Sequence, residues 1–160
     1  MATSQEFTVQ EAAKIVGTTE RNVRFWSGPA GIVTAEISNP QIQRSPKLFS
    51  RRNLLELRIV TVLAQRGIGL DHIRRALTSL AEKIDQHPSI IERLLKKPET
   101  QSLLAWNSLK TWRLTAWDED SEKAGENIIA AQNVYREIVR SEVTIVVNIG
   151  LLARRILARG

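Results

Sequence analysis

The chain of 160 residues contains no cysteine, which excludes disulfide bonds, thiolate metal sites and thiol redox switches. It has only two histidines, His72 and His87, too few for a histidine-rich metal site. The longest apolar stretch, near residues 143–152, is interrupted by Asn148 and is far too short to span a bilayer. No basic-then-apolar signal pattern opens the sequence, so we expect a cytoplasmic protein with no membrane association.

The sequence also lacks the arrangements that enzymes use. It shows no nucleophile–base pair, no cluster of metal ligands and no phosphate-binding loop, and its glycines at 28, 31, 67 and 69 are typical of turns. We therefore expect neither enzymatic activity nor a cofactor.

Positive charge is present in excess and is unevenly placed. The net charge is +6, and residues 1–80 hold 11 Lys and Arg against 6 Asp and Glu, whereas residues 81–160 hold 12 against 11. A basic first half favours contact with phosphates, which supply most of the non-specific affinity for nucleic acid. Charge alone does not establish DNA binding, because many proteins carry a similar excess without it.

Two short helices joined by a tight turn are predicted near the N-terminus. The first, over residues 9–16, opens with a capping box formed by Thr8 and Glu11 and has apolar residues at i, i+3, i+4 and i+7. Gly17 ends it, and residues 20–26 form a second helix whose outer face carries Arg21, Asn22 and Arg24. This arrangement presents side chains to the DNA major groove.

A basic hairpin and a second pair of helices are predicted next. The hairpin has arms at 32–37 and 44–49, with Arg44 and Lys47 as its cations, and would act as a wing beside the helix pair. Pro46 makes the returning arm an edge strand. Helical periodicity then predicts helices from 51 to 66 and from 70 to about 86.

The remaining residues predict a smaller region of mixed structure. We expect helices at 89–97, 99–110, about 121–138 and 150–158, and extended segments at 111–117 and 143–147. The fold class is therefore mainly α, with a winged helix-turn-helix DNA-binding domain in residues 1–86 followed by a smaller helical or α+β region in residues 87–160.

Four motifs in the first half occur in the order and spacing of a known family. They are Phe7–Val9 with Glu11–Ala13, Val16–Trp26, Lys47–Ser50, and Arg66–Ile73. On these motifs, residues 7–80 resemble the DNA-binding domain of MerR-type transcriptional regulators. The resemblance covers just under half the chain.

The resemblance implies a sequence-specific bacterial transcription regulator that binds a pseudo-palindromic promoter site as a homodimer, with RNA polymerase as a further partner. It also implies that residues 90–160 supply dimerisation and any sensing of a small-molecule effector. Pro88 and Pro98 interrupt the region where the family has its long dimerisation helix, so we expect this dimer to be built differently. The alternative is an architectural protein that uses the same fold to bend DNA with little sequence preference.

The candidate DNA-binding residues lie on the second helix and around the hairpin. Arg21, Arg24 and Asn22 are candidates for base contacts. We expect one of Phe25 and Trp26 to pack beneath the wing and the other to lie against the sugar-phosphate backbone, and Phe25 is kept as a DNA-binding candidate. The full set is Thr19, Arg21, Asn22, Arg24, Phe25, Arg44, Lys47 and Arg51. The competing interpretation is a solvated helix face on which an arginine pairs with Glu20 or Glu11.

Aromatic residues are few, at 5% of the chain, and three of the four tryptophans, together with the single tyrosine, lie in the second half. Aromatic walls can bind flat or cationic effectors, which makes a candidate pocket of Trp106, Trp112, Trp117 and Tyr135. An ordinary core or a dimer interface is the competing interpretation, because large aromatic side chains dominate such packing.

Overall fold

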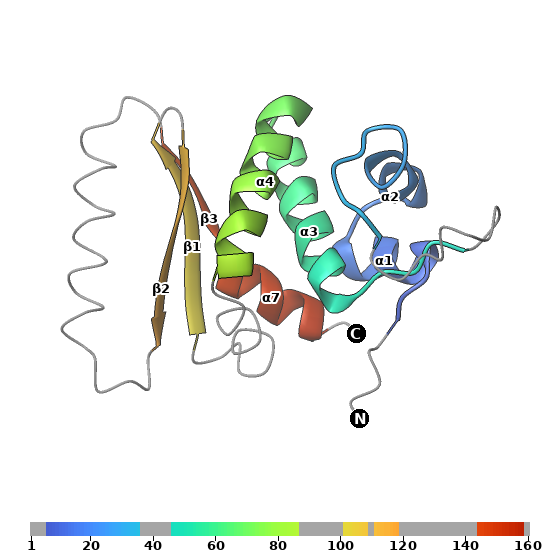
Figure 1. Cartoon of the computed structure of the whole chain (residues 1–160). Coiled ribbons are helices and arrows are strands. Elements are labelled where there is room, and N and C mark those ends of the chain that lie inside the picture. The colour runs from blue at the N-terminus through green and yellow to red at the C-terminus, as the bar shows by residue number, and fades with distance from the viewer. Residues whose placement is uncertain (1–5, 36–45, 87–100, 109–110, 119–143, 159–160) are drawn as a thin grey trace. The chain divides into compact units, whose positions relative to one another are not determined.

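The computed structural model describes residues 6–35, 46–86, 101–108, 111–118 and 144–158 (Figure 1). The chain divides into two compact units, one that ends at Arg74 and one that begins at Arg75. The division falls within helix α4, Leu70–Gln86. The domain boundary predicted between residues 86 and 87 stays a prediction, because residues 87–100 lie outside the described part.

Helix α1, Val9–Val16, begins and ends as the sequence predicts. The Thr8 hydroxyl accepts a hydrogen bond from the Glu11 N–H at 3.3 Å, and Glu11 Oε2 accepts one from the Thr8 N–H at 2.8 Å. These two bonds satisfy donors that the first turn of a helix otherwise leaves unpaired. At the other end Gly17 adopts φ 77°, ψ 45°, a left-handed conformation that glycine reaches without steric cost.

Helix α2, Glu20–Trp26, follows after a two-residue turn and starts at the N-cap Thr19. Val23 and Trp26 are buried on one side of it, at 0% and 5% exposure. Helix α1 contacts both α2 and the longer helix α3, Arg51–Gln65, so the three helices share one apolar core (Figure 1). The predicted helix-turn-helix is therefore confirmed.

The segments that flank the predicted wing are held differently from a simple hairpin. The N–H groups of Ile32 and Val33 both donate to the Trp26 carbonyl oxygen, at 2.8 and 3.1 Å, so the outgoing arm begins folded back on the end of α2. On the returning side, Phe49 pairs in antiparallel fashion with Phe7. The described parts of the two predicted arms, residues 32–35 and 46–49, thus bond to Trp26 and to Phe7. The tip of the predicted wing lies outside the described residues.

Helix α3 supplies the centre of this core. Leu54, Leu57 and Val60 are fully buried, and Thr61, at 1% exposure, donates its hydroxyl proton to the Leu57 carbonyl oxygen at 2.8 Å. Leu54, Leu57 and Thr61 are spaced i, i+3 and i+7, so they lie on one face of α3, and the predicted helix over residues 51–66 is confirmed. Gly67, with φ 77°, closes the turn before α4.

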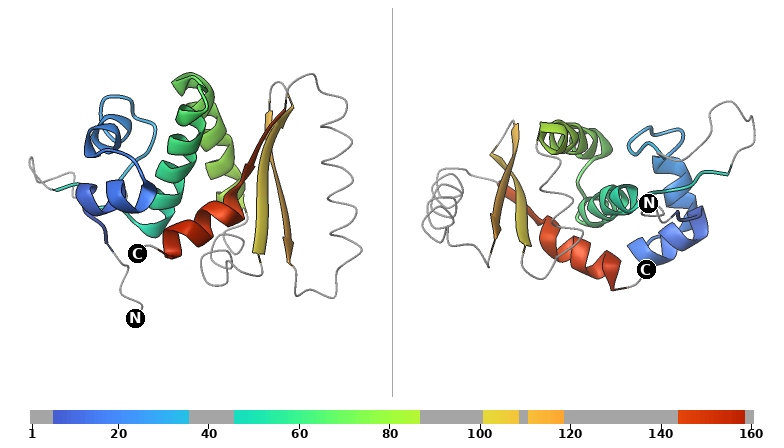
Figure 2. Two further views of the ribbon diagram at one scale, coloured as in Figure 1. Left: turned by 180° about the vertical axis from the view of Figure 1, so that it is seen from behind. Right: turned by 60° about the horizontal axis from the view of Figure 1, so that its bottom comes forward.

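The second unit contains a three-stranded antiparallel sheet in the order β2-β1-β3. The strands are β1, Gln101–Ser108, β2, Thr111–Asp118, and β3, Thr144–Asn148. Helix α7, Ile149–Leu157, continues directly from β3 and contacts β1. Both views of Figure 2 show β1 between its two partners and α7 leading away from the end of β3.

One prediction for this unit is wrong and three are confirmed. Residues 99–110 were expected to be helical, but 101–108 form β1, the central strand. Strand pairing on both sides satisfies its main-chain groups, and local helix preference does not outweigh that. The extended segments at 111–117 and 143–147 and the final helix are confirmed as β2, β3 and α7. The helices predicted at 89–97 and about 121–138 lie outside the described residues.

Candidate nucleic-acid interface

The exposed side of helix α2 is a single continuous face. Glu20, Arg21, Arg24 and Phe25 are exposed, while Val23 and Trp26 are buried. The spacing i, i+1, i+4, i+5 places the four exposed residues side by side on one half of the helix. We call them the α2 outer face. It presents two guanidinium groups, one carboxylate and one aromatic ring to solvent.

The two arginines of this face differ in their partners. Arg24 Nη2 lies 3.2 Å from Glu20 Oε2, and the two side chains are 65% and 46% exposed. An exposed pair of this i,i+4 kind contributes only roughly 0.3–0.5 kcal/mol and is screened by salt. Arg21 has no ion pair or hydrogen bond within the described residues. The competing interpretation, in which an arginine pairs with Glu20 or Glu11, therefore holds for Arg24. Because this pair is weak, Arg24 can leave it to bind another partner.

Thr19 and Asn22 are engaged in forming the turn. The Thr19 hydroxyl accepts a hydrogen bond from the Asn22 N–H at 3.2 Å, which caps α2. The Asn22 side-chain amide donates from Nδ2 to the Thr18 hydroxyl at 3.0 Å, and Asn22 is half-buried. Both residues thus fix the direction in which α2 leaves the turn.

The adjacent aromatic residues have separate positions, as the sequence predicts. Trp26 is buried at 5% exposure and its carbonyl oxygen holds the chain that follows α2. Phe25 is 44% exposed and adds an apolar surface to the α2 outer face. An exposed aromatic ring next to two arginines suits contact with the deoxyribose of a DNA backbone.

The cations around the predicted wing occupy three different situations. Lys47 is half-buried and its Nζ donates to the carbonyl oxygen of Ser27, the C-cap of α2. Arg51 is exposed at the first position of α3. Arg44 lies outside the described residues. The structure therefore brings Lys47 to the end of α2, a contact that nothing in the local sequence indicates.

Two further cations, which the sequence analysis missed, hold the helix-turn-helix in place. Arg58 of α3 donates from Nη1 to the carbonyl oxygen of Val16 at the end of α1. Arg74 of α4 donates from Nη2 to the Ala30 carbonyl oxygen at 2.9 Å, in the loop after α2. Positive charge at a helix C-terminus also interacts favourably with the helix dipole. Part of the basic excess is thus used inside the domain. The partners are 42 and 44 residues apart, so no sequence spacing predicts them.

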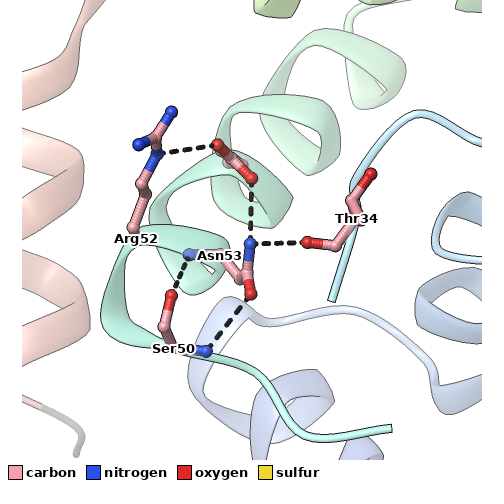
Figure 3. Close-up of polar contacts among 5 residues, drawn as sticks. Thr34, Ser50, Arg52 and Asn53 are labelled. Atoms are coloured by element: carbon pink, nitrogen blue, oxygen red, sulfur yellow. Dashed lines mark hydrogen bonds and ion pairs between the residues drawn. The ribbon is translucent and has the colours of Figure 1, made fainter. Parts of the chain in front are cut away.

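Asn53 joins the two ends of the segment that carries the predicted wing (Figure 3). It is 1% exposed, and its Nδ2 donates to the Thr34 carbonyl oxygen at 2.9 Å and to Glu56 Oε2 at 3.1 Å. Its Oδ1 accepts a hydrogen bond from the Ser50 N–H at 3.3 Å, while the Ser50 hydroxyl caps α3. Glu56 also accepts from Arg52 Nε at 3.4 Å. A buried amide with both ends satisfied fixes Thr34 next to Ser50.

The tryptophans of the candidate effector site lie on two neighbouring strands. Trp106 of β1 is paired in register with Arg113, Trp112 of β2 with Asn107, and Trp117 with Ser102. Tyr135 lies outside the described residues. The effector pocket remains a prediction. In the ranges that the structure describes, no three His, Asp or Glu side chains gather as a metal site would require.

Comparison with known proteins adds one finding to this geometry. Residues 7–80 match the family model described as MerR HTH family regulatory protein. No curated protein matches the chain significantly. The matched residues contain α1, α2, α3, the segment that carries the predicted wing and the first part of α4. No helix of the described ranges is long and apolar enough to cross a membrane.

Proposed function

We propose that this chain, a DNA-binding transcriptional regulator whose residues 7–80 form a MerR-type helix-turn-helix domain, acts as a homodimer on a pseudo-palindromic promoter site. The observation that carries the proposal is the α2 outer face, where two arginines project from a short helix fixed at both ends. A helix held in this way can enter the major groove without losing conformational freedom on binding.

Each candidate residue has a role in this proposal. Arg21 and Arg24 contact base edges, where an arginine fork recognises guanine through O6 and N7. Phe25 lies against the sugar-phosphate backbone. Phosphate contacts come from Arg44, Lys47 and Arg51, and they set the register of the domain on DNA. Thr19 and Asn22 orient α2, and the Asn22 amide oxygen adds a further contact to DNA.

The dimer follows from how few bases one copy can contact. Helix α2 is only seven residues long, so one domain contacts a few base pairs, and two copies are needed for an operator that is rare in a genome. Half-sites about 10 base pairs apart would place both α2 helices on one side of the duplex. We assign dimerisation, and the binding of any effector near Trp106, Trp112 and Trp117, to residues 87–160.

Fluorescence anisotropy with the full chain tests this function. The probes are a duplex from upstream of the protein's own gene and a scrambled duplex of equal composition, each at two salt concentrations. Binding to the promoter duplex at least ~10³-fold tighter than to the control supports a specific regulator. Tight and equal binding would instead favour the architectural alternative, and no binding to either duplex would overturn the proposal.

A further inference from the structure

The α2 outer face contains one residue that a purely phosphate-binding surface would exclude. Glu20 is the only acidic residue of α2, and its side chain is 46% exposed beside Arg21 and Arg24. A carboxylate brought toward DNA is repelled by the phosphates. In the first turn of α2 the Glu20 carboxylate interacts favourably with the helix dipole, but the helix does not need it as a cap, because the Thr19 hydroxyl already caps this end.

The chemistry of the major groove offers this carboxylate a partner. Of the base edges exposed there, only cytosine N4 and adenine N6 present amino donors, and an ionised glutamate is an acceptor alone. Adenine N6 lies next to the acceptor N7, which repels a carboxylate, so cytosine is the better match. Thymine presents O4 at the position of the cytosine amino group, which places two acceptors against each other.

The ion pair between Glu20 and Arg24 is weak, so little free energy is lost when it breaks and each side chain contacts a base instead. Of the three guanidinium nitrogens of Arg24, only Nη2 lies near Glu20, at 3.2 Å from Oε2, and exposed ion pairs of this kind favour the paired arrangement by only about twofold. A matched base contact is worth roughly 5- to 150-fold in discrimination. A base contact is therefore more favourable for each of the two side chains than their ion pair. Their i,i+4 spacing would place them on neighbouring bases of the groove.

We propose that Glu20 is a specificity-determining residue, whose carboxylate accepts a hydrogen bond from cytosine N4 while Arg24 donates to a neighbouring guanine. The inference rests on the proposed function and deepens it, because it states which base the operator carries at one position of each half-site. Arg24 and Glu20 together then recognise a guanine and a cytosine through opposite charges.

The test begins with selection by the full chain from duplexes with a randomised core of about 20 base pairs, enough for two half-sites. The preferred duplex is then compared with variants that carry a C·G to T·A change at each position in turn. Binding is measured for the wild type, E20A, E20Q and the control E6Q. Glu6 is exposed and precedes α1, so E6Q removes the same unit of charge away from α2.

Among the positions where the change costs the wild type roughly 5- to 150-fold in affinity, one symmetric pair of cytosines is expected to depend on Glu20. E20A should bind the cytosine and thymine duplexes within about twofold of each other, while E6Q keeps the wild-type preference. E20Q should bind both duplexes, because an amide can accept from cytosine N4 and donate to thymine O4. Arg24 is present throughout, so its contribution cancels when the base change is compared between variants.

Two outcomes would contradict the inference, and they differ from failure of the proposed function. If E20A weakens or strengthens every duplex by the same factor, Glu20 acts only through helix stability or overall charge. If E20A keeps the cytosine preference of the wild type, another residue reads that base. Selection that yields no preferred duplex at all would instead remove the proposed function itself.

Discussion

The ammonium group of Lys47 donates a hydrogen bond to the carbonyl oxygen of Ser27, the residue that caps the C-terminal end of α2. The two residues are 20 positions apart, and the contact ties the returning arm of the predicted wing to the helix that carries the arginines. A cation at this end of a helix compensates the negative end of the helix dipole. One side chain thus couples the two parts of the domain that we propose to contact DNA.

Replacement of Lys47 by glutamine is therefore expected to have two effects. The free energy of unfolding should fall by about 1 kcal/mol, because α2 loses a charged donor at its end. The salt slope of DNA binding should fall by about one unit, because an ammonium with three N–H groups can donate to Ser27 and a phosphate together. Urea unfolding and anisotropy at several salt concentrations measure these effects.

The matched control for Lys47 is K14Q, which removes an exposed lysine from the last turn of α1. It should leave the salt slope unchanged. If K47Q lowers stability while its salt slope equals that of the wild type, Lys47 only caps α2 and makes no phosphate contact.

Replacement of Arg24 by alanine is expected to reduce discrimination between the operator and a scrambled duplex by roughly 5- to 150-fold. Stability should change little, since Arg24 is 65% exposed and makes only the weak pair with Glu20. Anisotropy on both duplexes, together with thermal unfolding, measures the two quantities. R66A removes an exposed arginine at the end of α3 and serves as the control. Equal losses on both duplexes from R24A would assign Arg24 to phosphate rather than to a base.

Replacement of Asn53 by leucine is expected to destabilise the first unit by about 2–4 kcal/mol. The Thr34 carbonyl and the Ser50 N–H would both lose a partner in a site that is 1% exposed. Thr61→Val is the control, since it also removes a buried polar group from α3, but one that bonds only within its own helix. Urea unfolding compares the two variants. A loss for N53L no larger than that for T61V would show that the junction of Thr34 and Ser50 does not depend on Asn53.

The pH dependence of stability should reveal the capping box of α1. Hydrogen bonds from the main-chain N–H of Thr8 and then from its hydroxyl lower the pKa of Glu11 below its ordinary value of 4.5. The folded state therefore favours the ionised carboxylate more than the unfolded state does. Its contribution to stability is complete above the unfolded pKa and is lost as the pH falls through the lower, folded pKa.

The variant E11Q is accordingly expected to unfold more easily than the wild type at pH 7, and the difference should shrink as the pH falls below 4.5. Urea unfolding from pH 7 to pH 3 measures it, with E6Q as a control that also lacks one carboxylate. A wild-type advantage that stays constant over this range would mean that the carboxylate of Glu11 does not act through its charge.

Several elements could be predicted because their signals are local. The Thr8–Glu11 capping box, the glycine at position 17 and the apolar spacing of α3 each involve residues within a few positions of one another. The same holds for the two arginines of the α2 outer face, whereas only the structure shows that Trp26 is the buried and Phe25 the exposed aromatic residue. The helix-turn-helix and the candidates for base contacts could therefore be predicted from the sequence.

Contacts between distant residues could not be predicted in this way. The sequence of residues 101–108 predicts a helix, but these residues form β1, because β2 pairs with one edge of this strand and β3 with the other. Phe49, expected in a hairpin, pairs instead with Phe7, 42 residues earlier. In each case a partner from elsewhere in the chain satisfies main-chain groups, and a local pattern carries no information about that partner.

The sequence by itself determined where the first helices start and stop, which of their faces is apolar, and that two arginines share the outer side of α2. Caps and periodicity are properties of neighbouring residues, so they are encoded locally. Only the tertiary structure decided that Lys47, Arg58 and Arg74 hold the helix-turn-helix through carbonyl oxygens, and that Asn53 joins Thr34 to Ser50. These bonds depend on how the chain folds back on itself, because a main-chain carbonyl looks the same at every position of the sequence.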